Sequence, residues 1–354
     1  MKLLILTQKV DINDDILGFM HGWIREFANH VEKITVICLQ QGEYYLPKNV
    51  SVSSLGKEGG QSRFKYLWNF YKYIWQERKN YDTVFVHMNP IYLVFGGFFW
   101  KLQGKKTALW YTHRKVDLKL KIAEKFVDVI FTASKESFQL ESDKIKVLGH
   151  GIPIDDFKNP NTLAQGLYGN QLKIISVGRI TPIKNLDTLV EAANILNDRG
   201  VDFKITLVGG TINEGDEKYL EKLKKMVNDF RLNDCVVFAG SVPNREIKKY
   251  YWENDFSINL CPAGGVDKAV LESMAAGLLV IVSNKAFADY LGEFKDTLLF
   301  RERDEEDLVD KIISLKNSKQ IVEIRRRLFE ETKKRAGLFG LVVKIVEGFD
   351  NKRN

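Results

Sequence analysis

Residues 261–277 of the chain read CPAGGVDKAVLESMAAG, a glycine-containing loop followed by a helical pattern. An apolar run, Phe256–Leu260, comes directly before the loop, so the expected order is strand, loop and helix. The first amides of a helix have no partner inside the helix, and this order therefore forms an anion site. Glu272 lies about one turn inside the expected helix and can accept hydrogen bonds from a sugar diol. The stretch predicts a site for a nucleoside diphosphate whose ribose lies near this carboxylate.

The composition is that of a folded chain with two domains. At 354 residues the chain is long for one domain, and its hydrophobic content of 45% is sufficient for two buried cores. The net charge of +7 favours an anionic partner, which can be a nucleotide, an acidic membrane surface or a nucleic acid. The sequence has no helix-turn-helix, zinc-finger or RNA-binding signature, so nucleic acid is not expected as a partner.

The cysteines and the apolar segments are typical of a cytoplasmic protein. Cys38, Cys235 and Cys261 lie in or beside apolar runs without paired spacing, as expected of reduced cysteines. The first apolar run, Leu3–Thr7, ends too early for a signal peptide and predicts a buried strand. The most apolar later segment, Ile91–Trp100, has about half the length of a membrane span. We expect a chain that does not cross a membrane, while peripheral contact with the inner face of the membrane stays open.

Apolar runs alternate with helical patterns along the chain, which predicts the α/β class, with parallel sheets covered by helices. Amphipathic helices are expected at Ile16–Asn29 and Phe64–Glu77. A turn-rich stretch at residues 149–157 leads into polar residues up to Gln171, and we interpret it as the connection between two domains. The strands expected in the first half are Leu3–Thr7, Ile34–Leu39, Thr83–His87, Lys106–Tyr111, Val129–Thr132 and Lys146–Leu148.

A second alternating series begins at Leu172. A helix is predicted from Leu186, with Asn185 as its N-cap and Gly200 at its end. Another helical pattern covers the C-terminal residues from about Gly337. Besides the strand that begins at Leu172, the strands expected in this half are Lys204–Val208, Cys235–Ala239, Phe256–Leu260 and Leu279–Val282.

The second informative stretch, residues 176–185, reads SVGRITPIKN. The missing Cβ of Gly178, at the expected strand end, lets a ligand approach the backbone. Arg179 and Lys184 follow on the loop and at the next helix start, so both cations can converge above the carboxyl edge of the sheet. Arg binds phosphate as a fork and Lys as a point charge. The alternative is a loop with two solvated charges, but the helix that carries Glu272 favours the phosphate site.

Five features in a fixed order carry a resemblance to a known family. They are Gly178-Arg179, Lys184-Asn185, Val208-Gly209-Gly210, Phe238-Ala239-Gly240-Ser241-Val242 and Leu271-Glu272-Ser273-Met274-Ala275-Ala276-Gly277. This set resembles the C-terminal domain of retaining family 4 glycosyltransferases, specifically over residues 172–285 and more weakly over the N-terminal half. The resemblance implies the GT-B fold, in which two Rossmann-like domains face each other across a cleft. Residues 1–155, with a C-terminal helix of about 337–354 packing back on them, would bind the acceptor, and residues 172–336 would bind the nucleotide-sugar donor.

The resemblance also implies roles for individual residues. Arg179 and Lys184 would hold the diphosphate and stabilise the leaving nucleotide as negative charge builds up on it. Glu272 would accept from the ribose hydroxyls, and His113, just past a strand end, would contact the transferred sugar. A solvated carboxylate and a structural histidine are the alternatives for these two residues. The remaining predicted donor contacts are Gly178, Gly209, Ser241, Val242, Gly264, Gly265, Asp267, Lys268, Ala269 and Val270.

The donor implied by the resemblance is a UDP-sugar or GDP-sugar, bound as a substrate without a cofactor or metal, because two cations and a helix dipole can neutralise its charge. One departure from the family concerns Gly264. The family has two Glu residues separated by seven others, and Gly264 occupies the first of these positions while Glu272 occupies the second. Asp267, Lys268 or the amides of the glycine loop could replace the missing carboxylate, or activity could be altered or lost. A plain helix N-cap is the alternative role for Asp267.

The function predicted is a retaining hexosyltransferase that acts on a glycan or lipid-linked acceptor of the cell envelope. A nucleotide-sugar epimerase of the same fold is one rival, and a non-catalytic nucleotide-sugar-binding protein, suggested by Gly264, is another. An oxidoreductase is not expected, because no Gly-x-Gly-x-x-Gly follows the first strand of either half.

His87 and Asn89 stand at the end of the expected strand Thr83–His87, where they either line the cleft or form a turn before Pro90.

Residues 63–75, RFKYLWNFYKYIW, mix aromatic side chains with cations in a helical pattern. A helix of this kind can lie at an anionic lipid interface. Packing of the aromatic stripe on the sheet, with Lys65 and Lys72 in water, is the interpretation that we favour.

Overall fold

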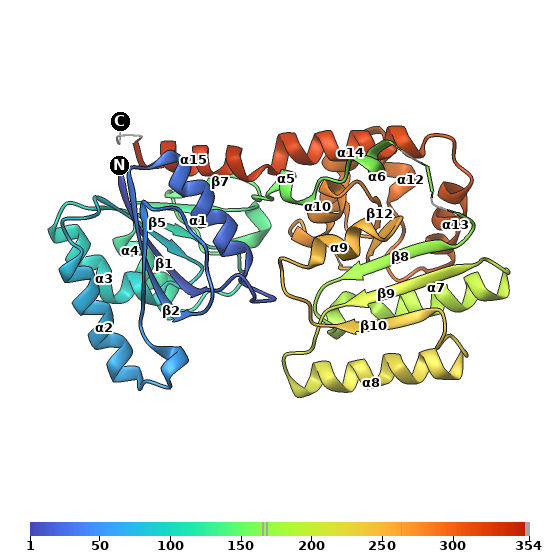
Figure 1. Cartoon of the computed structure of the whole chain (residues 1–354), viewed down its shortest axis with the longest axis horizontal. Helices are drawn as coiled ribbons and strands as arrows, with labels where there is room; N and C mark the ends of the chain where they lie inside the picture. The colour runs from blue at the N-terminus through green and yellow to red at the C-terminus, as the bar shows by residue number, and fades with distance from the viewer. Residues whose placement is uncertain (165, 168, 263, 351–354) are drawn as a thin grey trace. The chain divides into compact units, whose positions relative to one another are not determined.

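A computed structural model describes residues 1–164, 166–167, 169–262 and 264–350 of the chain (Figure 1). Ala263, in the predicted glycine loop, and residues 351–354 of the expected C-terminal helix lie outside the described residues. The chain forms two compact units. The first comprises Met1–Gly151, Pro243–Arg245 and the described residues from Leu338 onward, and the second comprises Ile152–Val242 and Glu246–Gly337. Each unit contains a parallel sheet covered by helices, so the predicted α/β class is confirmed.

The sheet of the first unit has seven described strands in the order β3-β2-β1-β4-β5-β6-β7. Its strands are β1 Lys2–Val10, β2 Lys33–Gln41, β3 Val50–Ser54, β4 Thr83–His87, β5 Lys106–Trp110, β6 Val129–Thr132 and β7 Ile145–Val147. Its helices are α1 Phe19–His30, α2 Arg63–Gln76, α3 Ile91–Leu102, α4 Leu118–Phe126 and α15 Leu338–Asp350. The sequence did not predict β3, whose five residues include only two apolar ones and pair with β2 alone.

The two faces of this sheet carry separate cores, because successive side chains of a strand point to opposite faces. Leu3 and Ile5 of β1 belong to a core that includes residues of α1 and α15. Leu4 and Leu6 belong to the other core, which α2, α3 and α4 cover. Each of these four side chains is fully buried, which stabilises the unit by about 1.5–3 kcal/mol per side chain. The C-terminal helix thus completes the first unit.

The packing expected for α2 is only partly observed. Phe70 and Ile74 are buried in the core, as expected of an amphipathic helix on a sheet. Phe64, Trp68 and Trp75, in contrast, are exposed by 87, 70 and 55%. The expectation that the aromatic stripe packs on the sheet is therefore wrong for these three side chains, because the helix has aromatic residues on both of its sides.

The sheet of the second unit has five described strands in the order β10-β9-β8-β11-β12. Its strands are β8 Leu172–Val177, β9 Phe203–Val208, β10 Val236–Gly240, β11 Phe256–Asn259 and β12 Leu279–Val282. The longer helices are α7 Leu186–Asp198, α8 Glu214–Asp229, α10 Lys268–Ala275, α13 Glu305–Lys316 and α14 Ile321–Ala336. The shorter helices are α5 Ile154–Phe157, α6 Pro160–Ala164, α9 Ile247–Trp252, α11 Ala288–Leu291 and α12 Lys295–Leu298.

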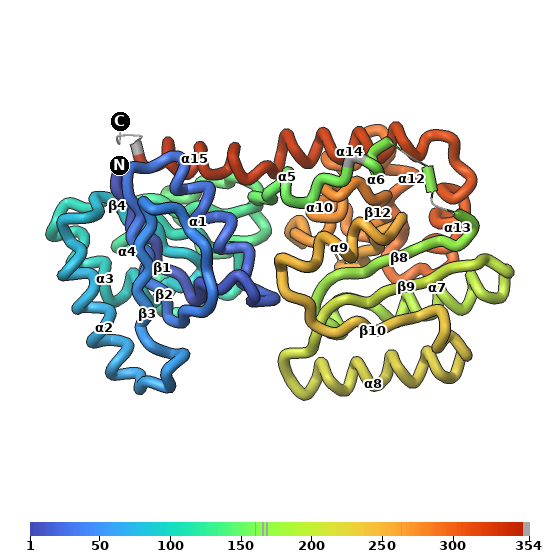
Figure 2. Tube along the Cα trace, viewed as in Figure 1, coloured from blue at the N-terminus to red at the C-terminus, as the bar shows by residue number. Residues whose placement is uncertain are grey.

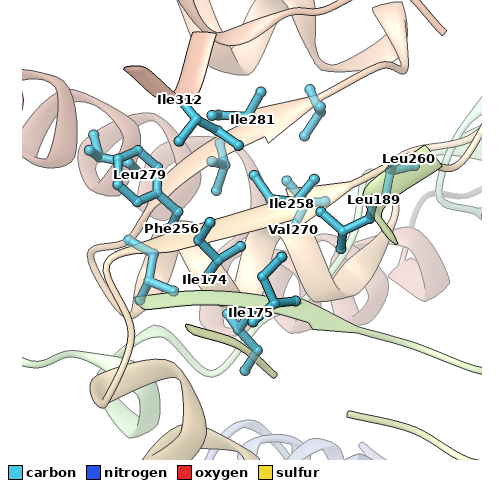
Figure 3. Close-up of a cluster of buried hydrophobic side chains, with 14 of the residues drawn as sticks. Ile174, Ile175, Leu189, Phe256, Ile258, Leu260, Val270, Leu279, Ile281 and Ile312 are labelled. Carbon is cyan, nitrogen blue, oxygen red and sulfur yellow. The ribbon is translucent and has the colours of Figure 1, made fainter. Parts of the chain in front are cut away.

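The core of the second unit lies between this sheet and its helices. Figure 3 shows Ile174 of β8, Phe256 and Ile258 of β11 and Leu279 of β12 packed in one cluster, which also includes Val270 of α10. Parallel strands covered on both faces are expected to be largely apolar, and β12 is apolar at each of its positions. None of the helices in the described part of the chain combines the length and the apolar character that crossing a bilayer requires.

Candidate donor-binding site

The strand order of the second unit places the predicted site residues at one edge of the sheet. The chain passes from β8 to β9 on one side, whereas β11 and β12 lie on the other side of β8. In open parallel sheets, ligands bind at such a point of reversal, outside the carboxyl ends of the strands. The loop after β8 carries Arg179 and Lys184, and the loop after β11 leads to Asp267 and α10. Strand order therefore brings together two stretches that are far apart in the sequence.

Two glycines shape the backbone at this edge. Gly178 has a φ of +149° and Gly209 a φ of +147°, a region that strains residues with a Cβ. A Cβ on Gly209 would overlap the carbonyl oxygen of Gly178, so the loops after β8 and β9 touch backbone to backbone. The amide of Gly178 also donates to the carbonyl of Val208 at 2.9 Å. These contacts hold in place the loop that carries Arg179.

A narrow hollow with a volume of about 10 Å³ opens between these loops. Gly178, Arg179 and Lys184 line it together with Asn259, at the end of β11. The hollow has room for about one water molecule, so a diphosphate would lie above it rather than inside it. The two cations that the sequence predicted to converge therefore do border the same hollow.

Asp267 connects the first of these loops to the start of α10. Its carboxylate forms an ion pair with Lys184, and the two side chains are only 19 and 18% exposed. The side-chain amide of Asn259 donates to the same carboxylate oxygen at 3.1 Å. The other carboxylate oxygen accepts from the amide of Ala269 at 3.2 Å, which makes Asp267 the N-cap of α10. Lys184 is thus held at the N-terminus of the predicted anion-binding helix.

The pKa values of the ion pair indicate that both members are charged. Burial alone would raise the pKa of Asp267, but the charge of Lys184 and the hydrogen bonds from Lys184, Asn259 and the Ala269 amide together outweigh burial and hold this pKa below its ordinary value. Burial likewise opposes the charge of Lys184, and the neighbouring Asp267 carboxylate raises the pKa of Lys184 above its ordinary value. In the ligand-free protein, Asp267 therefore neutralises one of the two predicted phosphate ligands.

Asn185 has a different role from the predicted one. It has a left-handed backbone conformation with a φ of +48°, and its side chain makes no cap hydrogen bond to α7. Instead, its side-chain amide donates to the carbonyl oxygen of Leu260 at 3.1 Å. Asn185 therefore occupies the predicted N-cap position before α7, but its side chain does not cap the helix, because it ties the loop after β8 to the end of β11. Asn is among the residues that tolerate the left-handed region best.

Glu272 is buried, which excludes the alternative of a solvated carboxylate. One of its oxygens accepts from the hydroxyl group of Tyr251 at 3.2 Å, and the other pairs with Lys268 at 3.3 Å. Burial raises the pKa of Glu272, against the opposing effects of Lys268 and Tyr251. No sequence signal pointed to Tyr251, because its residue type and its place in α9 are those of an ordinary core aromatic.

The amides predicted to meet a phosphate are partly engaged in capping. The amide of Ala269 donates to the side chain of Asp267, and that of Val270 donates to the backbone carbonyl of Asp267 at 3.2 Å. A phosphate at this helix would therefore compete with Asp267 for its donors as well as for Lys184. The carbonyl of Gly265, in the preceding loop beside Gly264, accepts from the side chain of Asn284 at 3.2 Å.

The predicted residues after β10 lie next to the loop after β9. A Cβ on Gly210 would meet the hydroxyl group of Ser241, so these two loops are adjacent. Val242 is partly buried against the core of the second unit. Within the described residues, no group of three His, Cys, Asp or Glu side chains is placed to hold a metal ion.

His113 belongs to the first unit, where it follows β5. Its ring is exposed, and its Nδ1 accepts from the amide of Lys115 at 3.0 Å. His87, the other histidine considered, is buried beside the rings of Phe19 and Trp23, with centroids 5.7 and 5.9 Å away. This packing favours a structural role for His87 over a place in a ligand site.

The whole chain resembles solved structures of the GT-B class. It matches the crystal structure of Anabaena Alr3699/HepE in complex with UDP and glucose with a TM-score of 0.75 and 16% identity, over 99% of this chain and 100% of that one. The chain therefore has the GT-B fold, with two Rossmann-like units, as predicted.

Sequence comparison identifies the family. Residues 160–335 match the family model described as Glycosyl transferases group 1, and through this stretch the chain belongs to that family. The amylovoran biosynthesis glycosyltransferase AmsK of Erwinia amylovora is 34% identical over 148 residues, which are 40% of this chain and 34% of the relative. The human GDP-Man:Man(3)GlcNAc(2)-PP-Dol alpha-1,2-mannosyltransferase is 26% identical over 164 residues, 43% of this chain and 33% of the relative. The matches thus span about a third of the length of these two relatives.

Proposed function

We propose that the chain is a glycosyltransferase that moves a hexose from a UDP-sugar or GDP-sugar to a glycan or lipid-linked acceptor, with retention of the anomeric configuration. The observation that carries this proposal is the position of Lys184 at the N-terminus of α10, with Arg179 on the same hollow. The names of the relatives support the choice of substrates. One structural neighbour is in complex with UDP and glucose, one relative is named for GDP-mannose and a dolichol-linked acceptor, and another is named as a glycosyltransferase of amylovoran biosynthesis.

In the proposed reaction, the bond between the sugar and the diphosphate breaks, and negative charge builds up on the leaving nucleotide. Arg179 and Lys184 stabilise this charge, and the dipole of α10 adds to their effect. Glu272 accepts hydrogen bonds from the ribose, once its carboxylate exchanges a present partner for a sugar hydroxyl. Two cations and a helix dipole supply the positive charge that the reaction needs, so we propose no further cofactor or metal.

We further propose that the first unit binds the acceptor, that His113 contacts the transferred sugar there, and that the protein works in the cytoplasm at the inner face of the membrane. The exposed ring of His113 supports such a contact. Asp267 is one candidate to replace the carboxylate that the family has at the position of Gly264, but it is the ion-pair partner of Lys184, and its proposed role is to hold this Lys rather than to contact the sugar.

A thermal-shift screen of UDP, GDP and their sugars tests donor binding, since a ligand that binds only the folded state raises Tm. Transfer to glycan and lipid-linked acceptors is then measured, with the anomeric configuration of the product read by NMR. We expect Arg179→Ala and Lys184→Ala each to lower the transfer rate by about 100-fold or more. Lys224→Ala is the matched control, because this Lys pairs with Glu221 on the surface of α8.

Unchanged rates in both site variants would refute the assignment of the diphosphate. Conversion of the donor into an epimeric sugar without any acceptor, shown by product analysis, would instead identify an epimerase. Nucleotide binding without turnover against the acceptor panel would identify a binding protein. The missing carboxylate at Gly264 would then explain the lack of turnover.

A further inference from the structure

An aromatic stripe runs along the outer side of α2 in the first unit. Phe64, Trp68, Tyr71 and Trp75 are spaced at i, i+4, i+7 and i+11, which places them on one side of a helix. All four are exposed, whereas the buried residues of the helix, Phe70 and Ile74, lie on a different side of it. Large aromatic side chains rarely form a continuous exposed stripe on a soluble surface unless something covers it.

Helix α3 extends this stripe into a wider surface. Its Phe95, Phe98 and Leu102 are also exposed, at a spacing of i, i+3 and i+7. The hydroxyl group of Tyr71 donates to the carbonyl of Phe95 at 3.2 Å, so the two helices meet at this point (Figure 2). We call the exposed apolar side chains of the two helices the α2–α3 surface: Phe64, Trp68, Tyr71, Trp75, Phe95, Phe98 and Leu102.

The charges around the α2–α3 surface have almost one sign. Residues 63–79 contain five Lys or Arg and a single acidic residue, Glu77, and residues 91–102 add Lys101 and no acidic residue. Lys65 and Lys72 are exposed on α2, as the sequence predicted, and Lys101 is exposed on α3. The guanidinium group of Arg78 lies over the ring of Trp75, 4.1 Å from its centroid. Cations therefore surround the aromatic side chains, and the complementary surface is an anionic one.

We propose that the α2–α3 surface binds the anionic surface of a lipid bilayer, with the aromatic rings in the interface and the cations on the headgroups. Trp and Tyr are suited to this interface because one end of each ring system is apolar and the other is polar. Each Lys or Arg near an anionic leaflet adds attraction that salt weakens. A protein partner fits the apolar side chains equally well, but the nearly uniform positive charge favours a lipid surface.

This inference rests on the first unit alone and does not depend on the donor chemistry of the second. It deepens the proposed function in one respect, because a unit bound to the bilayer would meet a lipid-linked acceptor where such acceptors reside. Vesicle binding and nucleotide binding are measured separately, so the failure of either proposal is recognised by itself.

The test is co-sedimentation of the full chain with vesicles of phosphatidylcholine alone and of phosphatidylcholine mixed with phosphatidylglycerol. We expect binding to the mixed vesicles only, and weaker binding as salt rises. Trp68→Ser with Trp75→Ser should lower the affinity about tenfold or more. The double variant Lys65→Gln with Lys72→Gln should lower the affinity for the mixed vesicles about 25-fold, because each cation contributes a factor of about five.

Phe339→Ser is the matched control, because this exposed aromatic lies on α15, whose core contacts are on the other face of the sheet. It should bind vesicles as the unchanged chain does, and the nucleotide-induced rise in Tm should be the same in all variants. Equal binding to both kinds of vesicle, or equal binding by the Trp variant, would overturn the proposal. Absence of vesicle binding together with a dimer in light scattering that the Trp variant loses would assign the surface to self-association instead.

Discussion

Replacing Asp267 by Asn tests how the candidate site is held together before a donor binds. The variant removes the negative charge beside Lys184 but keeps an oxygen that can cap α10. Removing one partner of a buried ion pair lowers the free energy of unfolding by about 3–5 kcal/mol. Because Asp267 and Lys184 are still 19 and 18% exposed, we expect a loss at or below the lower end of this range, about 2–3 kcal/mol. A unit of this size loses about 2–4 °C of Tm per kcal/mol, so Tm should fall by about 4–12 °C. Asp267→Ala should lose about 1 kcal/mol more, because it also removes the cap.

The pH dependence of this loss follows from the two pKa shifts. Because the pKa of Asp267 is lowered in the folded state, its charge contributes stability at pH values above its unfolded-state pKa of about 4. This stability is lost as the pH falls through the folded-state pKa. The raised pKa of Lys184 means that its contribution is present below about 10.4 and is lost as pH rises through the folded value. The deficit of Asp267→Asn should therefore be constant between about pH 5 and 9 and shrink in acid.

Nucleotide binding should partly repair the same variant. A bound diphosphate supplies the negative charge that Lys184 lacks in Asp267→Asn, so UDP or GDP should raise Tm more in this variant than in the unchanged chain. Thermal unfolding with and without nucleotide measures this difference, and a double-mutant cycle with Lys184→Gln measures the coupling. We expect a coupling of about 1 kcal/mol or more. An unchanged Tm in Asp267→Asn, or purely additive losses in the cycle, would refute the reasoning.

Two further variants test other parts of the site. Glu272→Gln should raise the Tm of the ligand-free chain at pH 7, because burial raises the pKa of Glu272 and its charged form therefore costs stability above the unfolded pKa. The gain in Tm over the unchanged chain should vanish near pH 4, and the variant should bind nucleotide more weakly. A gain in Tm that is smaller at pH 7 than at pH 4 would contradict this. Gly209→Ala should lower stability by about 3 kcal/mol or more and abolish the nucleotide-induced shift, since its Cβ would overlap the carbonyl of Gly178. Gly200→Ala, at a positive φ with open space around it, is the control that should cost only about 1 kcal/mol, and equal losses in the two variants would show that the overlap is relieved.

Much of the fold could be predicted from local sequence patterns. The alternation of apolar runs with helical patterns led to parallel sheets, and the bounds of β4, β6 and β12 agree with the expected strands. The glycine loops and the cations after β8 marked the edge of the sheet where the structure places them. These features are local, because strand and helix periodicity and the backbone freedom of glycine act over a few neighbouring residues.

The sequence pattern could not assign the partners of the charged and polar residues. Asp267 was considered as an N-cap, but its ion pair with a side chain 83 positions away depends on the strand order. Arg325 stands at the start of a charged stretch, yet it is fully buried and lies 3.6 Å from the carboxylate of Asp255. Both pairings follow from packing between elements that are distant in the chain.

The chain's alternation of strands and helices and the places of its glycine loops were thus determined by the sequence alone. The tertiary structure decided which side of α2 is covered, because Phe64 and Phe70 are equally apolar in the sequence and only the sheet beneath the helix distinguishes them. It also decided that Glu272 is buried against Tyr251. Periodicity depends on neighbouring residues, whereas burial and charge pairing depend on which distant elements pack against each residue.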